Sequence, residues 1–255
     1  MKETDRMIDI AKHYLGDYFG YEYRDIVHER LSSCTLHLVS PKNYKHKAKS
    51  FIHQMNHKAR KLDRATINIE QQKLIVSSIK DAALLNNGSA GRAMALSSLN
   101  NNNKENRVEM GRAAFVSEMN DIRLQDQSFV DVMILHELIH IASYQLTDKG
   151  FSNGVGDVNN GFNEWLTDII AIENAKTIHR NNIRIDKSKS HIEPVYNLST
   201  SHNLVNPSYT VPKGFITKYK HIIFPAMIVG DFAPAGGREE FLHFSNKIIP
   251  YEIPF

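Results

Sequence analysis

Apolar side chains recur along this chain with two periods, one typical of helices and one typical of strands. Residues 4–19 and 44–62 place them at every third or fourth position, which predicts two amphipathic helices. Between these helices, residues 34–40 alternate enough to predict a strand that ends at Pro41. The N-terminal part of the chain therefore combines helices with strand structure.

Three further segments continue this pattern towards the middle of the chain. Residues 65–70 and 73–78 have the composition of β-strands, and together they predict a hairpin. Residues 86–106 are polar and rich in Gly and Asn at both ends, which predicts a long loop with at most one short helical turn. This loop is either a plain surface insertion or a flap over a cleft. Residues 112–119 then predict another strand.

The second half of the chain has mainly helical patterns. Residues 129–143 are apolar on nearly every side and predict a buried helix, and residues 161–172 predict a second helix with one apolar face. Residues 213–230 and 237–249 also predict helices, the first of them kinked or broken at Pro225.

Length and composition allow one compact domain with two lobes, or two small domains. The chain has 255 residues, of which 42% are hydrophobic, and this is enough for a sizeable core. We expect an α+β fold with a small mixed or antiparallel sheet. Residues 1–147 would form an α/β lobe, and residues 148–255 would form a mainly helical lobe.

Targeting and redox features are few. No apolar run approaches the roughly eighteen residues that a membrane helix needs. The N-terminus is amphipathic and contains acidic residues, unlike a secretory signal or a typical transit peptide. Cys34 is the single cysteine, so an internal disulfide is excluded, and we interpret it as a small buried residue. These features predict a cytoplasmic protein, although delivery into another cell by a leaderless route would leave no trace in the sequence.

The predicted buried helix contains the sequence HELIH at residues 136–140. Histidines four positions apart lie on one face of a helix, so His136 and His140 can both bind one metal ion. Glu137 leans towards the same side, where it could take a proton from a zinc-bound water. Two core histidines would also explain the spacing, but burying two imidazoles and a carboxylate without partners is costly. A metal ion would supply the partner.

A second motif, GFNEWLTDIIAI, lies in the next predicted helix. The chain after His140 is long enough to bring this helix back beside the first, so that Glu164 completes a His, His, Glu ligand set with its fourth position open. Asp168, one turn further on, is placed to accept the ring N–H of a ligand histidine and to fix its tautomer. Asp157, in the Gly-containing segment between the two helices, is an alternative third ligand.

The two motifs together, HELIH and FNEWLTD, resemble the gluzincin group of zinc metallopeptidases, in which H-E-x-x-H is followed by N-E-x-x-[ST]-D. The resemblance implies a zincin-like fold, one Zn2+ ion bound by His136, His140 and Glu164, and a hydrolase that cleaves protein or peptide substrates with Glu137 as general base. Asp168 matches the carboxylate that supports a ligand histidine.

The resemblance also implies how substrate is held. In zinc peptidases an edge strand lies beside the cleft, and an extended peptide pairs with its backbone. The corresponding residues here would bind substrate mainly through backbone N–H and C=O groups: Ala113, Ala114, Phe115, Val116 and Ser117. Similar enzymes add a histidine or tyrosine that stabilises the oxyanion. The first candidates for this role are Tyr209 and His202, and Tyr196 is a third.

A strongly basic helix face offers a different function. Residues 42–64 contain many lysines and arginines and a single acid, Asp63, although the whole chain has a net charge of only +3. This face could bind nucleic acid, an anionic membrane or an acidic protein partner, with a zinc site that is only structural. It could equally be a solvated face whose long side chains shield the core.

Two further alternatives keep the peptidase chemistry. The protein could recognise a single regulatory partner and leave generic peptides uncleaved. It could also be latent, with residues 86–106 or the C-terminal tail covering the cleft.

Overall fold

The computed structural model of the protein describes residues 3–85, 91–99, 107–118, 127–143, 160–181 and 214–248. Its elements in chain order are α1 (Glu3–Phe19), α2 (Tyr21–Ser32), β1 (Cys34–Val39), α3 (Tyr44–Lys61), α4 (Ile69–Leu84), β2 (Gly91–Leu99), β3 (Arg107–Ser117), α5 (Gln127–Ala142), α6 (Asn160–Asn181), α8 (Phe215–Phe224), a π-helical turn (Pro225–Val229), a 3₁₀ turn (Ala233–Ala235) and α9 (Arg238–Ile248).

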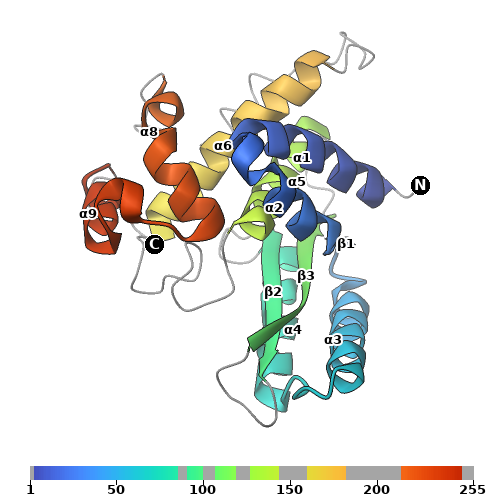
Figure 1. The fold of residues 1–255 in the computed structure, drawn as a ribbon. Helices are drawn as coiled ribbons and strands as arrows, with labels where there is room; N and C mark the ends of the chain where they lie inside the picture. The colour runs from blue at the N-terminus through green and yellow to red at the C-terminus, as the bar shows by residue number, and fades with distance from the viewer. Residues whose placement is uncertain are drawn as a thin grey trace.

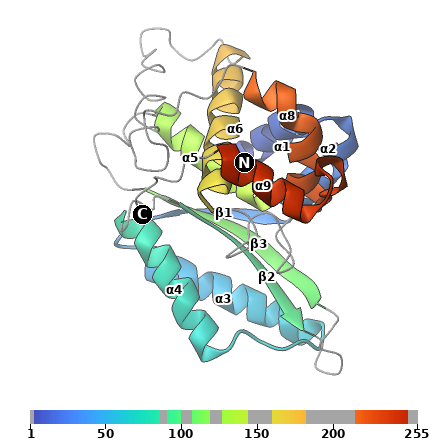
Figure 2. The same cartoon turned by 90° about the vertical axis from the view of Figure 1, so that its left-hand side faces the viewer.

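A small mixed sheet divides the described part of the molecule into two layers. Its three strands lie in the order β1-β3-β2, with β1 parallel to β3 and β2 antiparallel to it. Helices α3 and α4 cover one face of the sheet, and the remaining helices gather on the other side (Figure 1, Figure 2). The predicted α+β class with a small mixed sheet is confirmed.

Alternating side chains of β3 enter two separate hydrophobic cores, because successive residues of a strand point to opposite faces. Ala113 and Phe115 pack with buried side chains of α3 and α4. Ala114 and Val116 belong to the larger core, which joins α1, α2, α5, α6, α8 and α9. Since α5 and α6 share this larger core, their packing determines how the side chains of the HELIH and FNEWLTD motifs meet.

The structure corrects the position of the predicted substrate strand. β3 is the central strand, and its residues 112–116 pair with β1 on one side and with β2 on the other, as Ala113 does with Thr35 and Met94; Ser117 pairs with Val39 of β1. Their backbone N–H and C=O groups already form the sheet, so they cannot also pair with an added peptide. The prediction that an edge strand is formed by Ala113, Ala114, Phe115, Val116 and Ser117 is therefore wrong.

The predicted hairpin at residues 65–78 is also wrong, because α4 begins within it. Asn68 caps this helix: its side chain accepts a hydrogen bond from the Gln71 N–H at 2.8 Å, and the Gln71 side chain accepts one from the Asn68 N–H at 3.0 Å. This reciprocal pair is a capping box. The buried residues of α4 then follow the helical period, and they are Ile75, Ile79, Ala82 and Ala83.

The stretch at residues 86–106 is not a loop throughout, because β2 occupies its middle. β2 lies at one edge of the sheet, with β3 on one side and no described strand on the other. The remaining residues of this stretch lie outside the described ranges.

The other predicted elements are confirmed, although α6 continues nine residues beyond the predicted end at 172 and β3 begins five residues before the predicted start at 112. The strands at 34–40 and 112–119 correspond to β1 and β3, and the helices correspond to α1, α3, α5, α6, α8 and α9. Pro225 ends α8, as expected, and α2 is a further helix that the sequence pattern did not reveal. Within the described part of the chain, no helix combines the length and the apolar character needed to cross a membrane.

Two arginines hold the C-terminal end of α5. Arg30 of α2 donates to the carbonyl oxygen of Ala142 at 2.6 Å, and also to a carbonyl of the π-helical turn at 2.6 Å. Buried Arg112 of β3 donates to the carbonyl of Ile141, and Glu109 balances its charge through contacts of 2.5 and 2.8 Å. Carbonyls at a helix C-terminus carry partial negative charge, so guanidinium groups stabilise them. The helix is thereby attached to the sheet and to the C-terminal helices.

Candidate metal centre

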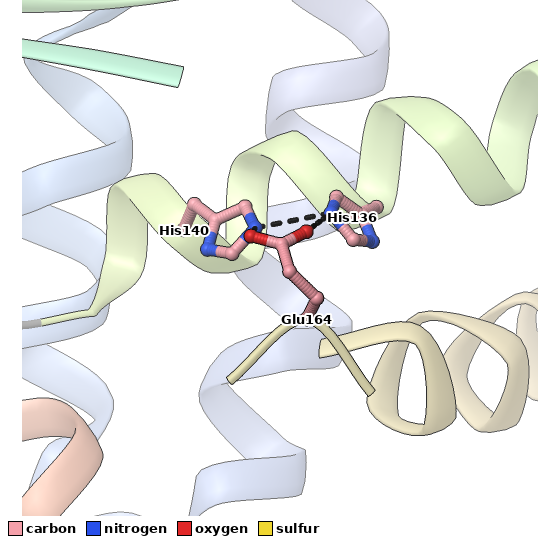
Figure 3. Close-up of side chains that lie close together, drawn as sticks. All are labelled: His136, His140 and Glu164. Carbon is pink, nitrogen blue, oxygen red and sulfur yellow. Dashed lines mark hydrogen bonds and ion pairs between the residues drawn. The ribbon is translucent and has the colours of Figure 1, made fainter. Parts of the chain in front are cut away.

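α5 and α6 bring three side chains of metal-ligating types together at the edge of the larger core. His136 and His140 lie one turn apart on α5, and each is only 8% exposed. Glu164 comes from α6 and points at both imidazoles (Figure 3). The apolar side chains around the histidines are buried in the larger core, among them Leu135, Leu138, Ile139 and Ile141. This burial leaves the histidines facing α6.

The three side chains converge within hydrogen-bonding distance. The Nε2 atoms of His136 and His140 are 3.0 Å apart. Glu164 Oε2 lies 3.1 Å from His136 Nε2, and Glu164 Oε1 lies 3.4 Å from His140 Nε2. Among the described residues, these three form the group of His, Cys, Asp and Glu side chains that is compact enough to hold a metal ion.

Asp168 determines which nitrogen of His136 carries a proton. Asp168 Oδ1 lies 2.8 Å from His136 Nδ1, the contact that the sequence led us to expect. An ionised carboxylate can only accept, so Nδ1 must be the donor. In the neutral imidazole, the lone pair of His136 Nε2 then faces the carboxylate of Glu164. These acceptors repel each other unless a proton or a metal cation lies between them.

The geometry and the chemistry of this group fit zinc. Tetrahedral zinc with bonds of about 2.0–2.1 Å to nitrogen and oxygen separates its ligand atoms by roughly 3.3 Å. The observed separations of 3.0, 3.1 and 3.4 Å are close to this value. Two imidazoles and one carboxylate are also a common donor set of catalytic zinc, whereas calcium and magnesium prefer oxygen ligands alone.

The ionisation states of His136 and Glu164 favour a positive charge between them. Burial alone would lower the pKa of His136, but Asp168 and Glu164 outweigh it and raise this pKa well above 6.5. Burial would raise the pKa of Glu164, but the two imidazoles outweigh it and hold this pKa below its usual range. Without metal, a proton on His136 therefore satisfies the carboxylates, and a metal ion bound here would displace that proton.

The centre is open on the side of Glu164. The side chain of Glu164 is 38% exposed, compared with 10% for each histidine side chain. Glu164 is therefore the most solvent-exposed of the three side chains, and buried apolar side chains of the larger core lie around the histidines.

Glu137 lies beside the group and packs against the edge strand. It is 6% exposed. A Cβ atom placed on Gly91 of β2 would lie 2.6 Å from both Cγ and Cδ of Glu137, closer than real Cβ contacts allow. Gly91 is thus the position on β2 where the absence of a side chain makes room for Glu137. Burial raises the pKa of Glu137, and His136 and His140 oppose this rise without cancelling it.

The remaining site residues predicted from sequence have different outcomes. Tyr196, His202 and Tyr209, the oxyanion candidates, lie outside the described residues, as does Asp157, the alternative third ligand. Their roles remain predictions. The basic helix α3 lies on the opposite side of the sheet from α5 and α6 (Figure 2).

Sequence reasoning missed Gly91 and the two arginines that hold α5. Gly91 lies in a Gly- and Asn-rich stretch, where another glycine carries no signal. Its role depends on the pairing of β2 with β3, which no local pattern reveals. Arg30 and Arg112 acquire their roles only through contacts with distant carbonyls.

Comparison of the chain with protein-family models, with curated proteins and with solved structures finds no match. The interpretation of the site therefore depends on its geometry and on the two motifs.

Zinc should stabilise the folded protein, because only the native fold brings the three candidate ligands together. With free zinc at 100 times Kd, the stabilisation should be about 2.7 kcal/mol, or roughly 5–10 °C in Tm for a chain of this size. Thermal unfolding of the metal-free protein, with and without zinc, measures it. His140→Ala and Glu164→Gln should lose most of this shift, whereas His46→Ala on exposed α3 should keep it. An equal zinc shift in the parent and in His140→Ala would contradict the proposed ligands.

A side chain at position 91 should clash with Glu137. We expect Gly91→Val to lower the free energy of unfolding by about 1–3 kcal/mol, and to lower it less when Glu137 is also changed to Ala. Urea unfolding of the four members of this double-mutant cycle measures the coupling. Ala93→Val, two residues along β2, is the control, and Glu137→Ala should not relieve its effect. If Gly91→Val lowered the free energy of unfolding by the same amount in the parent and in Glu137→Ala, the two residues would not be in contact.

Proposed function

We propose that the protein is a zinc-dependent metallopeptidase that hydrolyses peptide bonds. The observation that carries this proposal is the convergence of His136, His140 and Glu164, with the buried carboxylate of Glu137 beside them. A zinc ion bound there would polarise a substrate carbonyl and acidify a water molecule. The two sequence motifs and their likeness to the gluzincin pattern support the same reaction class.

Glu137 has the properties of a proton carrier. A carboxyl group whose pKa is raised by burial can accept and release a proton closer to neutral pH than an exposed one. In the proposed reaction, Glu137 takes a proton from the attacking water as the water oxygen bonds to the carbonyl carbon. It then gives this proton to the amine nitrogen as the C–N bond breaks. Asp168 keeps the proton of His136 on Nδ1 throughout.

The edge strand β2, rather than β3, is the strand we propose for substrate binding. One of its sides pairs with β3, and no described strand lies on its other side. Gly91 at its start packs against Glu137. A peptide that paired with the outer edge of β2 would therefore run towards the proposed general base.

The alternative of a purely structural zinc site has less support. Structural zinc usually has four protein ligands and no access to solvent. The described residues supply three ligands, and the third, Glu164, is partly exposed. The basic face of α3 is separated from these ligands by the sheet, so a binding function there does not require the metal centre (Figure 2).

Glu137→Gln separates catalysis from metal binding. The amide keeps the size of the carboxylate but cannot accept the proton, so cleavage should fall by about 10²–10⁴-fold while zinc content is unchanged. Cleavage is measured by mass spectrometry of a proteome-derived peptide library, which detects a peptidase of broad specificity. The same measurement on the intact proteins of a cell extract detects cleavage of a single partner protein. Glu29→Gln, on an exposed part of α2, is the matched control and should cleave normally. Equal cleavage by zinc-loaded Glu137→Gln and by the parent would refute the peptidase assignment.

A further inference from the structure

A groove lies between α3 and α4. These two helices cover the face of the sheet opposite α5 and α6 (Figure 2). The volume of the groove is about 660 Å³. Asn56 of α3 accepts a hydrogen bond from the N–H of Ile67 at 2.8 Å, so the end of α3 lies beside the start of α4. The two helices are therefore antiparallel neighbours, and the groove runs along them.

The residues that line the groove follow the helical period on both helices. On α3 they include Lys49, Ile52, His53 and Asn56, and on α4 they include Ile69, Gln72, Lys73, Val76 and Lys80. The span from Ile69 to Lys80 corresponds to about 16 Å of helix. The groove therefore has the length of about three helical turns, which suits a short helix laid between two others.

The groove combines an apolar strip with cationic rims. Ile52, Ile69 and Val76 form the apolar strip, and the exposed Lys49, Lys73 and Lys80 provide the charge. Ile69 is 71% exposed, an unusual position for a large apolar side chain. Other large apolar side chains exposed near it on the α3–α4 unit are Leu62 at 55% and Leu74 at 68%.

The charge of α3 is not balanced within the helix, whereas α4 carries Glu70 and Asp81 as well as Lys73 and Lys80. α3 contains six lysines and arginines and no acidic residue. None of the residues that line the groove is acidic, and no salt bridge within the described part of the chain involves Lys49, Lys73 or Lys80. An acidic partner would therefore find unneutralised ammonium groups on both rims.

We propose that this groove binds an acidic amphipathic helix of a partner protein. Its apolar side would cover Ile52, Ile69 and Val76, and its carboxylates would meet the rim lysines. A nucleic acid fits less well, because the groove has no Phe, Tyr or Trp for base stacking and no arginine for bidentate phosphate contacts. This binding function goes beyond the proposed peptidase activity and does not depend on it, since the groove and the metal centre lie on opposite sides of the sheet.

Fluorescence anisotropy with the full-length Glu137→Gln protein tests the proposal without cleavage of the probe. The probe is a labelled fourteen-residue helical peptide, with leucines at every third or fourth position and glutamates on the other face. One control peptide replaces the leucines with serines, and a second replaces the glutamates with lysines. The acidic amphipathic peptide should bind at least about tenfold more tightly than the serine peptide, and the lysine peptide should not bind.

Variants of the groove then locate the binding site. Lys49→Glu with Lys73→Glu should weaken binding more than about tenfold, and Ile69→Ser should weaken it severalfold. Lys220→Glu, a single charge reversal at an exposed position of α8, should leave binding unchanged, and each single variant Lys49→Glu and Lys73→Glu is compared with it. Circular dichroism establishes that each variant is folded.

Three results would overturn the proposal. The first is no binding of the acidic amphipathic peptide by the folded parent. The second is an equal loss of binding in Lys220→Glu and in the groove variants. The third is displacement of the peptide by a DNA duplex that binds more tightly and loses affinity in the same lysine variants, since this would assign the groove to nucleic acid. Because zinc content and cleavage do not enter the measurement, failure here leaves the peptidase proposal unaffected.

Discussion

The structure depends on one electrostatic constraint: acceptor atoms from two helices face each other at the edge of the larger core. With Asp168 holding one proton of His136 on Nδ1, the opposite nitrogen can either carry a second proton, which it donates to the group in front of it, or coordinate a metal ion there. That group is the carboxylate of Glu164, 3.1 Å away, and the second imidazole lies at a similar distance. Such an arrangement is stable only around a positive charge. A proton satisfies it in part, and a divalent metal ion satisfies it fully.

The rest of the fold serves to keep these atoms close. Apolar residues of α5 and α6 share the larger core, so neither helix can rotate without exposing them. Arg30 of α2 and Arg112 of β3 each donate a hydrogen bond to a carbonyl group at the C-terminal end of α5, and so hold this end in place. β2 then lies so close to α5 that only glycine fits next to Glu137. The sheet also separates the metal centre from the basic groove, which leaves two surfaces of different chemistry on one domain (Figure 2).

Features that depend on residues close together in the sequence were predicted, whereas features that depend on contacts between distant segments were not. His136 and His140 were predictable because helix geometry alone places residues four apart on one face. Glu164 and Asp168 required the second motif, and the contact of Asp168 with His136 was found as expected. The central position of β3 in the sheet was not predictable. An edge strand and a central strand differ only in whether one or two other strands pair with them, and those strands are distant in sequence. Gly91 could not be recognised for the same reason.

The error at α4 has a different cause. Thr66, Ile67, Ile69 and Val76 favour strands by intrinsic propensity, and this signal was given too much weight. Two local signals indicated a helix: the capping pair Asn68 and Gln71, and the spacing of the apolar residues that follow. In the folded protein these apolar residues pack against β3, and this packing outweighs the intrinsic strand propensity of the segment. Without α4 as a helix, the groove beside α3 could not have been recognised.

Zinc K-edge X-ray absorption of the zinc-loaded protein tests the central claim most directly, because it reports the atoms bound to the metal. The account predicts four nitrogen and oxygen ligands at about 2.0–2.1 Å, with the multiple-scattering pattern of two imidazoles. In His140→Ala the pattern should fall to that of one imidazole or disappear with the metal. A spectrum of six oxygen ligands, or a two-imidazole spectrum unchanged in His140→Ala, would contradict the account.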